Sequence, residues 1–316
     1  MRELISQTPA YKIIQADKRA GTLSHAYLLV CQDQVMHEAY LKVLAKLMLC
    51  DKSEDFCDNC RVCKLIDSLS HPDVFYYPKD GKLSSEHADE IVRQSVIRPF
   101  EITKKLFIIN QFEKLNQSQN KLLKTLEEPP QNTHILLSSL RPTAVLPTIK
   151  SRSKIIEIPP FSRKQLGDFA LRQGFFGEKL ELSLSLADGK VGELLRYYEA
   201  DELLDLRELA LDILSDMTAK NLPSFASRLK DVNISDFIGI LKLQLSNVLS
   251  LLAGGTHAAS EKLINITQKS RYGSIIGIIE RLNALEKSQN FNLNGTMLVD
   301  GILFAVMEEK SKWQKL

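Results

Sequence analysis

Short apolar runs, rich in β-branched and aromatic residues, alternate with segments of helical periodicity through the first half of the chain. Near-continuous apolar runs separated by helices are typical of a parallel sheet that is covered on both faces. We therefore expect an α/β domain with a five-stranded parallel sheet and helices on both faces. The predicted strands are Tyr27–Cys31, Asp73–Tyr77, Leu106–Asn110, His134–Ser138 and Lys154–Ile158.

Helical patterns replace the strands after Pro159-Pro160, and this proline pair indicates a domain boundary. Glycines interrupt the next helical segment and predict a small unit of short helices. From about Asp201 onward, apolar residues spaced by threes and fours predict long amphipathic helices. The predicted domains are an α/β domain at 1–160, a small helical lid at 161–200 and an all-helical domain at 201–316.

Three apolar stripes illustrate the helical periodicity. Leu122, Leu123 and Leu126 predict a helix that ends before Pro129-Pro130. A second stripe lies early in the helical half, and a third lies near its middle, where packing inside the domain is the commoner use of such a pattern. These two stripes are Leu203, Leu206, Ala210, Ile213 and Met217, and then Leu241, Leu245 and Val248.

The composition is that of an ordinary globular protein. The chain has 316 residues, of which 44% are hydrophobic and 25% are charged. Its apolar runs look shorter than a membrane span, and its first residues lack the order of a signal peptide, so we expect a cytoplasmic protein without membrane contact. A net charge of +2 creates no strong field and argues neither for nor against a nucleic-acid partner.

Four cysteines crowd into one short segment with the spacing Cys-x6-Cys-x2-Cys-x2-Cys: Cys50, Cys57, Cys60 and Cys63. Four thiolates around a tetrahedral ion make a closed structural zinc site, and this pattern predicts one zinc ion without a catalytic role. An iron–sulfur cluster, a redox pair and four reduced thiols without metal are the alternatives. The fifth cysteine, Cys31, ends a predicted strand and is expected to be a small buried residue.

The segment between the first strand and the next helix lies where a phosphate-binding loop would be, but lacks its chemistry. Such a loop needs two glycines, a lysine and a hydroxyl to hold the phosphates and Mg²⁺. Here Cys31 and Met36 replace the glycines, His37 replaces the lysine and Glu38 replaces the hydroxyl. A carboxylate at that position would repel a phosphate.

Four sequence signatures resemble the clamp-loader branch of the AAA+ proteins of bacteria. They are His25–Leu28, the cysteine cluster, Leu122–Pro130 with its Leu-Glu-Glu-Pro-Pro ending, and Leu146–Ser153 with its Ser-Arg pair. All four motifs lie in the first half of the chain. The second half resembles the family only in its helical periodicity. It implies an AAA+ domain carrying a four-cysteine zinc module at 50–63, then a lid and a helical collar.

The second nucleotide motif of the family is altered too. Active relatives place Asp-Glu after a central strand, to hold Mg²⁺ and to polarise the attacking water. This chain has Asn110 and Gln111 there. Ser138 or Ser139 fills the position that senses the γ-phosphate, and Gly189–Gly192 lacks the lid arginine of active relatives. The resemblance therefore implies a subunit that neither binds nor hydrolyses ATP.

Arg152 departs from this pattern of loss. It stands in Ser151-Arg152-Ser153, where the family has Ser-Arg-Cys. In the family this arginine reaches the ATP site of the next subunit, where a guanidinium stabilises the transferring phosphoryl group. The residues alone also fit a solvated surface arginine between Lys150 and Lys154.

The function implied is a rigid, non-hydrolysing stator in the clamp loader of bacterial DNA polymerase III. It would act in DNA replication within a hetero-oligomeric ring of ATPase (gamma/tau) and delta subunits, which loads the sliding clamp on primed DNA. An active clamp-loader ATPase is disfavoured by the missing phosphate ligands. A zinc-dependent nucleic-acid-binding module acting outside a ring is the remaining alternative, and the near-neutral charge does not favour it.

Overall fold

The computed structural model describes residues 1–79, 81–255, 260–289 and 295–311. These residues form two compact units. The first contains Met1–Phe175 and Ala187–Leu194, and the second contains Phe176–Leu186 and Leu195–Leu316. The segment 161–200 therefore contributes to both units, and its role as a separate lid domain stays a prediction.

A five-stranded sheet forms the centre of the first unit. Its strand order is β2-β3-β4-β1-β5, and every neighbouring pair is parallel. The central strands β3 and β4 are buried along their whole length, which explains the apolar runs Leu106–Ile109 and Ile135–Leu137 within them. The strands are β1 Ala26–Cys31, β2 Val74–Tyr77, β3 Lys105–Ile109, β4 Thr133–Ser139 and β5 Lys154–Ile158. All five predicted strands are confirmed, with ends shifted by one residue at most.

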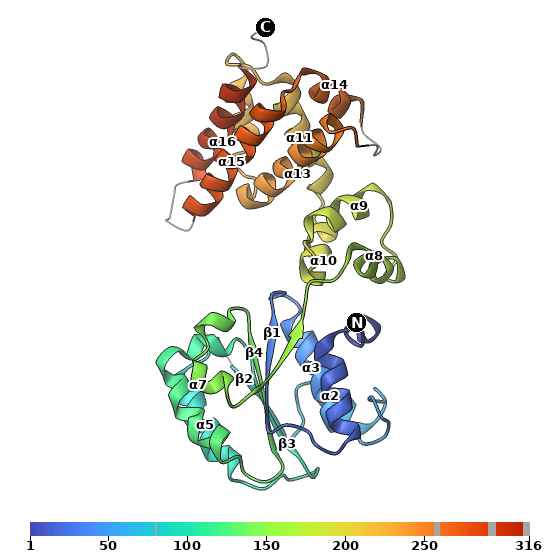
Figure 1. Ribbon diagram of the computed structural model, residues 1–316, viewed down its shortest axis with the longest axis vertical. Coiled ribbons are helices and arrows are strands. Elements are labelled where there is room, and N and C mark those ends of the chain that lie inside the picture. Colours follow the sequence, from blue (N-terminus) through green and yellow to red (C-terminus); the bar gives the residue numbers. More distant parts are fainter. Residues whose placement is uncertain (80, 256–259, 290–294, 312–316) are drawn as a thin grey trace. The chain divides into compact units, whose positions relative to one another are not determined.

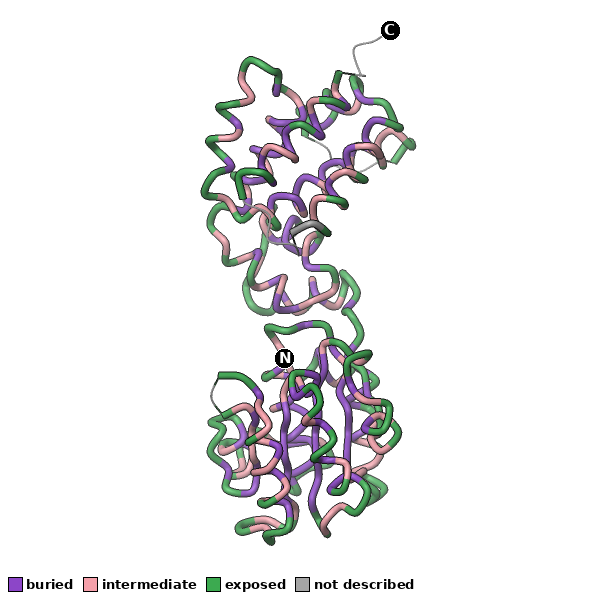
Figure 2. The backbone as a smooth tube through the Cα atoms, turned by 90° about the vertical axis from the view of Figure 1, so that its left-hand side faces the viewer, coloured by how far each residue is buried: buried purple, intermediate pink, exposed green. Residues whose placement is uncertain are grey.

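Helices cover both faces of this sheet. Figure 1 shows α2 and α3 on one face, and α5 and α7 on the other. The helices of this unit are α1 Arg2–Ile5, α2 Pro9–Arg19, α3 His37–Leu49, α4 Arg61–Asp67, α5 Ser85–Ser95, η1 Phe112–Leu122, α6 Leu123–Glu127, η2 Pro142–Ala144, α7 Pro147–Lys150 and α8 Arg163–Arg172. In Figure 2 the buried residues follow the strands and the inner sides of these helices.

The predicted helix around Leu122, Leu123 and Leu126 is confirmed as the α-helix α6, which ends at Glu127, before Pro129-Pro130. The 3₁₀ segment η1 ends at Leu122, and α6 covers only five residues. Two buried side chains of η1 bond to backbone outside it: Glu113 accepts from Leu140 N–H, and Gln119 accepts from Leu146 N–H. Leu122 and Leu126 still lie in the core, as predicted.

Of the three glycines predicted to break the helices after Pro160, Gly174 and Gly189 lie between helices, whereas Gly177 is the first residue of a helix. Helices α9 (Gly177–Leu186) and α10 (Val191–Glu199) follow α8, and the breaks between them contain Gly174 and Gly189. Gly189 has φ +74°, and a Cβ there would lie 2.5 Å from Pro160 Cβ. Both facts require glycine at this turn.

The rest of the second unit is helical. Its further helices are α11 Leu203–Asp216, α12 Leu222–Arg228, α13 Ile234–Leu252, α14 Glu261–Lys269, α15 Tyr272–Gln289 and α16 Gly295–Lys310. The predicted stripe from Leu203 to Met217 is buried, and so are Leu241, Leu245 and Val248 on α13. The stripe on α13 therefore packs inside its own unit.

Helix α13 corrects the expectation that no apolar segment is long enough to span a membrane. By length and composition alone, Ile234–Leu252 could cross one. Its buried side chains, however, belong to the core that α13 shares with α11, α14, α15 and α16. A core helix of a helical unit accounts for its apolar character.

Candidate metal centre and altered nucleotide site

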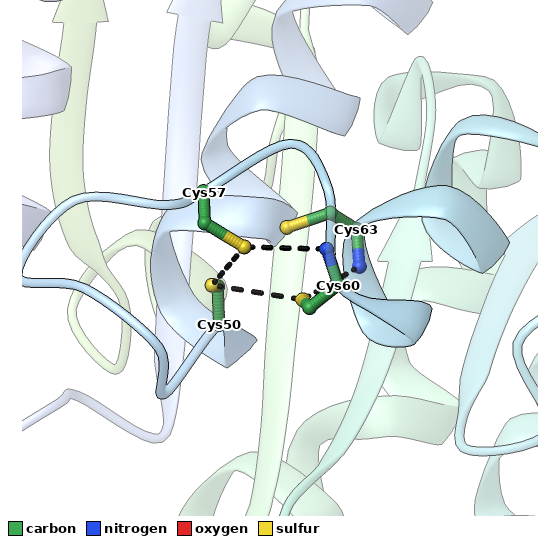
Figure 3. A group of neighbouring side chains, drawn as sticks. All are labelled: Cys50, Cys57, Cys60 and Cys63. Carbon is green, nitrogen blue, oxygen red and sulfur yellow. Dashed lines mark hydrogen bonds between the residues drawn. The ribbon is translucent and has the colours of Figure 1, made fainter.

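The four predicted ligand cysteines come together at the end of α3 and the start of α4 (Figure 3). Cys50 caps the C-terminus of α3, and Cys60 caps the N-terminus of α4. Cys57 lies in the loop before α4, and Cys63 lies within that helix. Their four sulfur atoms all lie within 4.8 Å of one another, so they could hold one metal ion.

The spacing of the sulfur atoms fits a small tetrahedral ion. Sulfurs bound at about 2.3 Å in a tetrahedron lie about 3.8 Å apart. The sulfur of Cys50 lies 3.7 Å from that of Cys57 and 3.9 Å from that of Cys60. The donor set, four thiols without a carboxylate or imidazole, is the one found in closed structural zinc sites.

Backbone N–H groups point at two of these sulfurs. Cys60 N–H donates to Cys57 Sγ over 3.3 Å, and Cys63 N–H donates to Cys60 Sγ over 3.4 Å. The N–H groups of Cys60 and Asn59 lower the pKa of the Cys57 thiol to about 6. Burial instead raises the pKa of Cys63. Donors of this kind stabilise thiolates, which are the form that binds a metal.

Contacts outside the cysteines also hold this loop. The ammonium of Lys18, on α2, donates to the backbone carbonyls of Cys50 (2.5 Å), Ser53 (3.1 Å) and Asp55 (2.7 Å). The buried ring of Phe56 lies under the guanidinium of Arg2, 4.3 Å from its centroid. The metal loop is therefore fixed to the first helices of the chain by packing and hydrogen bonds of its own.

The altered phosphate-binding positions meet around the imidazole of His37, which is the first residue of α3 and is buried. Its Nε2 donates to the carbonyl of Cys31 over 2.9 Å, and its Nδ1 lies 3.1 Å from Oδ1 of Asn110. Ser138 Oγ donates to the same Asn110 oxygen over 2.9 Å and accepts from the N–H of Gln111 over 3.2 Å. Residues expected to contact a nucleotide thus bond to one another.

The other altered positions take no part in this cluster through their side chains. Glu38 is 59% exposed and forms an ion pair with Lys42 on the surface of α3. Met36 caps α3 through its backbone. The predicted burial of Cys31 is confirmed, and this burial raises the pKa of its thiol to about 11.

Asp33 is a central residue of this region that the sequence did not single out. Its carboxylate is buried and accepts from Tyr40 OH (2.9 Å), Gly192 N–H (3.0 Å) and Met36 N–H (3.3 Å). It thereby joins the loop after β1 to the first turn of α10. The sequence does contain a sign of this role, because Asp33 places a carboxylate in the middle of the segment where an ATPase would bind phosphate.

Little space is left beside this loop. The cavity between Cys31–Asp33 and Gly189–Lys190 has a volume of about 10 Å³. That is about the room that one water molecule needs, whereas pockets for drug-sized ligands have several hundred Å³.

Arg152 lies at the opposite edge of the sheet from His37. Cys31 ends β1 and Asn110 follows β3, whereas Arg152 comes just before Lys154, the first residue of β5. Because all strands are parallel, these two positions are at opposite strand ends. This position places Arg152 away from the cluster around His37. Its side chain is 34% exposed and therefore faces solvent in part.

Comparisons with known proteins show which family the chain resembles. The family described as "DNA polymerase III, delta subunit" matches residues 6–162. DNA polymerase III subunit delta' of Bacillus subtilis (strain 168) is 24% identical over 307 residues, which cover 91% of each chain. The chain belongs to the DNA polymerase III delta-prime family. The predicted fold class, an α/β domain with a five-stranded parallel sheet followed by helical parts, is confirmed by the structure.

Two further relatives extend the comparison. The delta-prime subunit of Escherichia coli (strain K12) is 26% identical over 211 residues, covering 61% of this delta-prime family member and 60% of the relative. A crystal structure of a DNA polymerase III gamma subunit-related protein from Thermotoga maritima MSB8 has 18% sequence identity and a TM-score of 0.49. It covers 94% of this chain and 99% of the other.

Proposed function

We propose that this chain is the non-hydrolysing stator of a DNA polymerase III clamp loader and that it neither binds nor hydrolyses ATP. The observation that carries the proposal is the hydrogen-bonded cluster of His37, Asn110 and Ser138, which uses the groups that an ATPase would turn toward nucleotide and Mg²⁺. The buried carboxylate of Asp33 adds a negative charge where phosphates would be. Both features oppose nucleotide binding.

Arg152 acts on the ATP site of a neighbouring subunit in this proposal. Its position at the amino edge of the sheet supports a role outside the chain's own altered site. A partly exposed guanidinium can reach a neighbour's phosphate without unfolding of the backbone. There it would stabilise the charge of the transferring phosphoryl group.

Cys50, Cys57, Cys60 and Cys63 bind one structural zinc ion in this proposal. The near-tetrahedral sulfur spacing and the N–H donors support zinc. With four thiolates bound, no coordination position remains for water. The ion would therefore hold the loop between α3 and α4 in place and would not take part in chemistry.

The partners are those of the family. The chain would join gamma/tau ATPase and delta subunits in a cytoplasmic hetero-oligomeric ring, with residues 201–316 as its collar domain and 161–200 as its lid. The ring would load the sliding clamp on primed DNA.

Calorimetry and reconstitution test the function. Titration of the isolated chain with Mg-ATP should give no binding heat. Addition of the chain to gamma/tau and delta subunits should raise DNA-stimulated ATP turnover and permit clamp loading. Micromolar ATP binding, or equal loading without this chain, would contradict the proposal.

A further inference from the structure

Two motifs that carry the family resemblance meet in a single ion pair. Glu127 belongs to Leu-Glu-Glu-Pro-Pro and Arg152 to the Ser-Arg motif. Nη2 of Arg152 lies 2.7 Å from Oε1 of Glu127. The other terminal nitrogen, Nη1, donates to the carbonyl of Thr148 over 3.0 Å and to Ser151 Oγ over 3.2 Å. Both terminal nitrogens of the guanidinium are thus held by its own chain.

The backbone that carries this pair is firmly anchored. Leu126, next to Glu127, and Ile149, on α7, are both buried in the core of the first unit. Gln119 is buried as well and ties down the segment before α7. Its amide donates to the carbonyl of Ala144 over 3.1 Å and accepts from Leu146 N–H over 2.9 Å. The side chains of Glu127 and Arg152, in contrast, reach the surface.

The position of Glu127 is unusual for a carboxylate. It is the last residue of α6, where unpaired carbonyl groups disfavour negative charge. Arg152 supplies the compensating positive charge. The pair is also easy to exchange, because Glu127 is 48% and Arg152 34% exposed, and exposed ion pairs are weak. A phosphate, with more charge and more acceptor oxygens, can replace the carboxylate.

We propose that Glu127 is the positioning residue of Arg152. It holds the guanidinium in one orientation at the edge of the sheet until the phosphate of a neighbouring subunit's nucleotide takes its place. This inference rests on the proposed role of Arg152, and it gives the Leu-Glu-Glu-Pro-Pro motif a function. An arginine that is already ordered loses less conformational freedom when it meets the phosphate.

The isolated chain gives a test that needs no ATP. Phenylglyoxal modifies accessible arginines, and peptide mass spectrometry reads the modification of Arg152. Glu127→Gln should raise this rate about two- to fivefold, the range expected from the loss of an exposed ion pair. Glu128→Gln is the matched control, since it makes the same charge change one residue away, and it should leave the rate unchanged. Equal rates in wild type and Glu127→Gln would overturn the inference.

The reconstituted complex tests the role in turnover. Glu127→Gln should lower DNA-stimulated ATP turnover about two- to fivefold. The difference in turnover between wild type and variant should become smaller at high salt, because salt screens the ion pair of the wild type. The double variant Glu127→Gln/Arg152→Ala should match Arg152→Ala alone, because Glu127 acts through Arg152. Additive losses would overturn the inference while the proposed function stands. Wild-type turnover in Arg152→Ala would overturn the proposed function, and the positioning role with it.

Discussion

The imidazole of His37 lies 3.1 Å from the side-chain oxygen of Asn110. In an ATPase the first position carries the lysine that neutralises phosphate, and the second carries the carboxylate that helps hold Mg²⁺. Here the two side chains bond to each other, across 73 residues of sequence. The altered site is therefore a packed polar cluster with a structural role, and it has features that single substitutions can test.

Restoring the lysine alone should not restore ATP binding. His37→Lys would place an ammonium beside an amide and a carbonyl, in a region that Met36 and the Asp33 carboxylate still occupy. We expect no binding heat with Mg-ATP and a loss of about 1–3 kcal/mol of stability, because the buried imidazole bonds are lost. Calorimetry and urea unfolding measure the two effects. The exposed control Glu38→Gln should stay within about 0.5 kcal/mol of wild type. Micromolar ATP affinity in His37→Lys would show that the missing lysine alone prevents ATP binding.

Metal removal should loosen one loop and leave the fold intact. We expect one zinc per chain by elemental analysis. After chelation the partly exposed thiols of Cys57 and Cys60 should react with iodoacetamide, whereas the buried Cys31 should stay slow. Burial raises the pKa of Cys31 to about 11, so at neutral pH it is protonated and unreactive.

The circular dichroism spectrum should change little on chelation, because Lys18 and Phe56 still fix the loop. Cys57→Ser should lower the zinc content, and Cys31→Ser, the matched control, should keep it. Iron in place of zinc, or global unfolding on chelation, would contradict this picture.

Asp33 should control the exposure of the segment before α10. Asp33→Ala removes the acceptor of three hydrogen bonds, so we expect a loss of roughly 1–3 kcal/mol and faster tryptic cleavage at Lys190. Asp188→Asn is the matched control, because that side chain is 89% exposed and lies in the same segment. Equal cleavage rates in wild type and Asp33→Ala would mean that packing alone holds the segment.

Much of this architecture could be predicted from the sequence, because the deciding signals are local. Continuous apolar runs gave all five strands, and the cysteine spacing alone marked the cluster. The contacts of Asp33 and Lys18 were missed, since Asp33 bonds to Gly192 over 159 residues of sequence and Lys18 to Cys50 over 32. Periodicity carries no information about such pairs.

Arg152→Ala should matter only within the assembly. Since the side chain is partly exposed, the stability and zinc content of the isolated chain should not change. Ring assembly should survive, because we assign it mainly to the C-terminal helices. DNA-stimulated turnover should fall in part, because one of several ATP sites loses a group worth on the order of 10³–10⁵ in rate at that site. Clamp loading, which needs the sites in concert, should fall further.

Two neighbouring variants sharpen this test. Arg152→Lys should rescue little, since a point charge cannot reproduce the planar guanidinium. Lys150→Ala removes a positive charge two residues away and should leave turnover unchanged. If Lys150→Ala and Arg152→Ala lowered turnover equally, a diffuse basic patch would be the better account of both residues.

The bond between the Asp33 carboxylate and the first turn of α10 has a further consequence. An ATPase receives the anion of this region from solution, and its occupancy follows the supply of ATP. In this chain the proposed counterpart is the Asp33 carboxylate, which is part of the protein, so its hydrogen bonds to Met36, Tyr40 and Gly192 do not depend on a dissolved ligand. A cell that runs low on nucleotide would empty the sites of its ATPases, but the carboxylate would remain in this one.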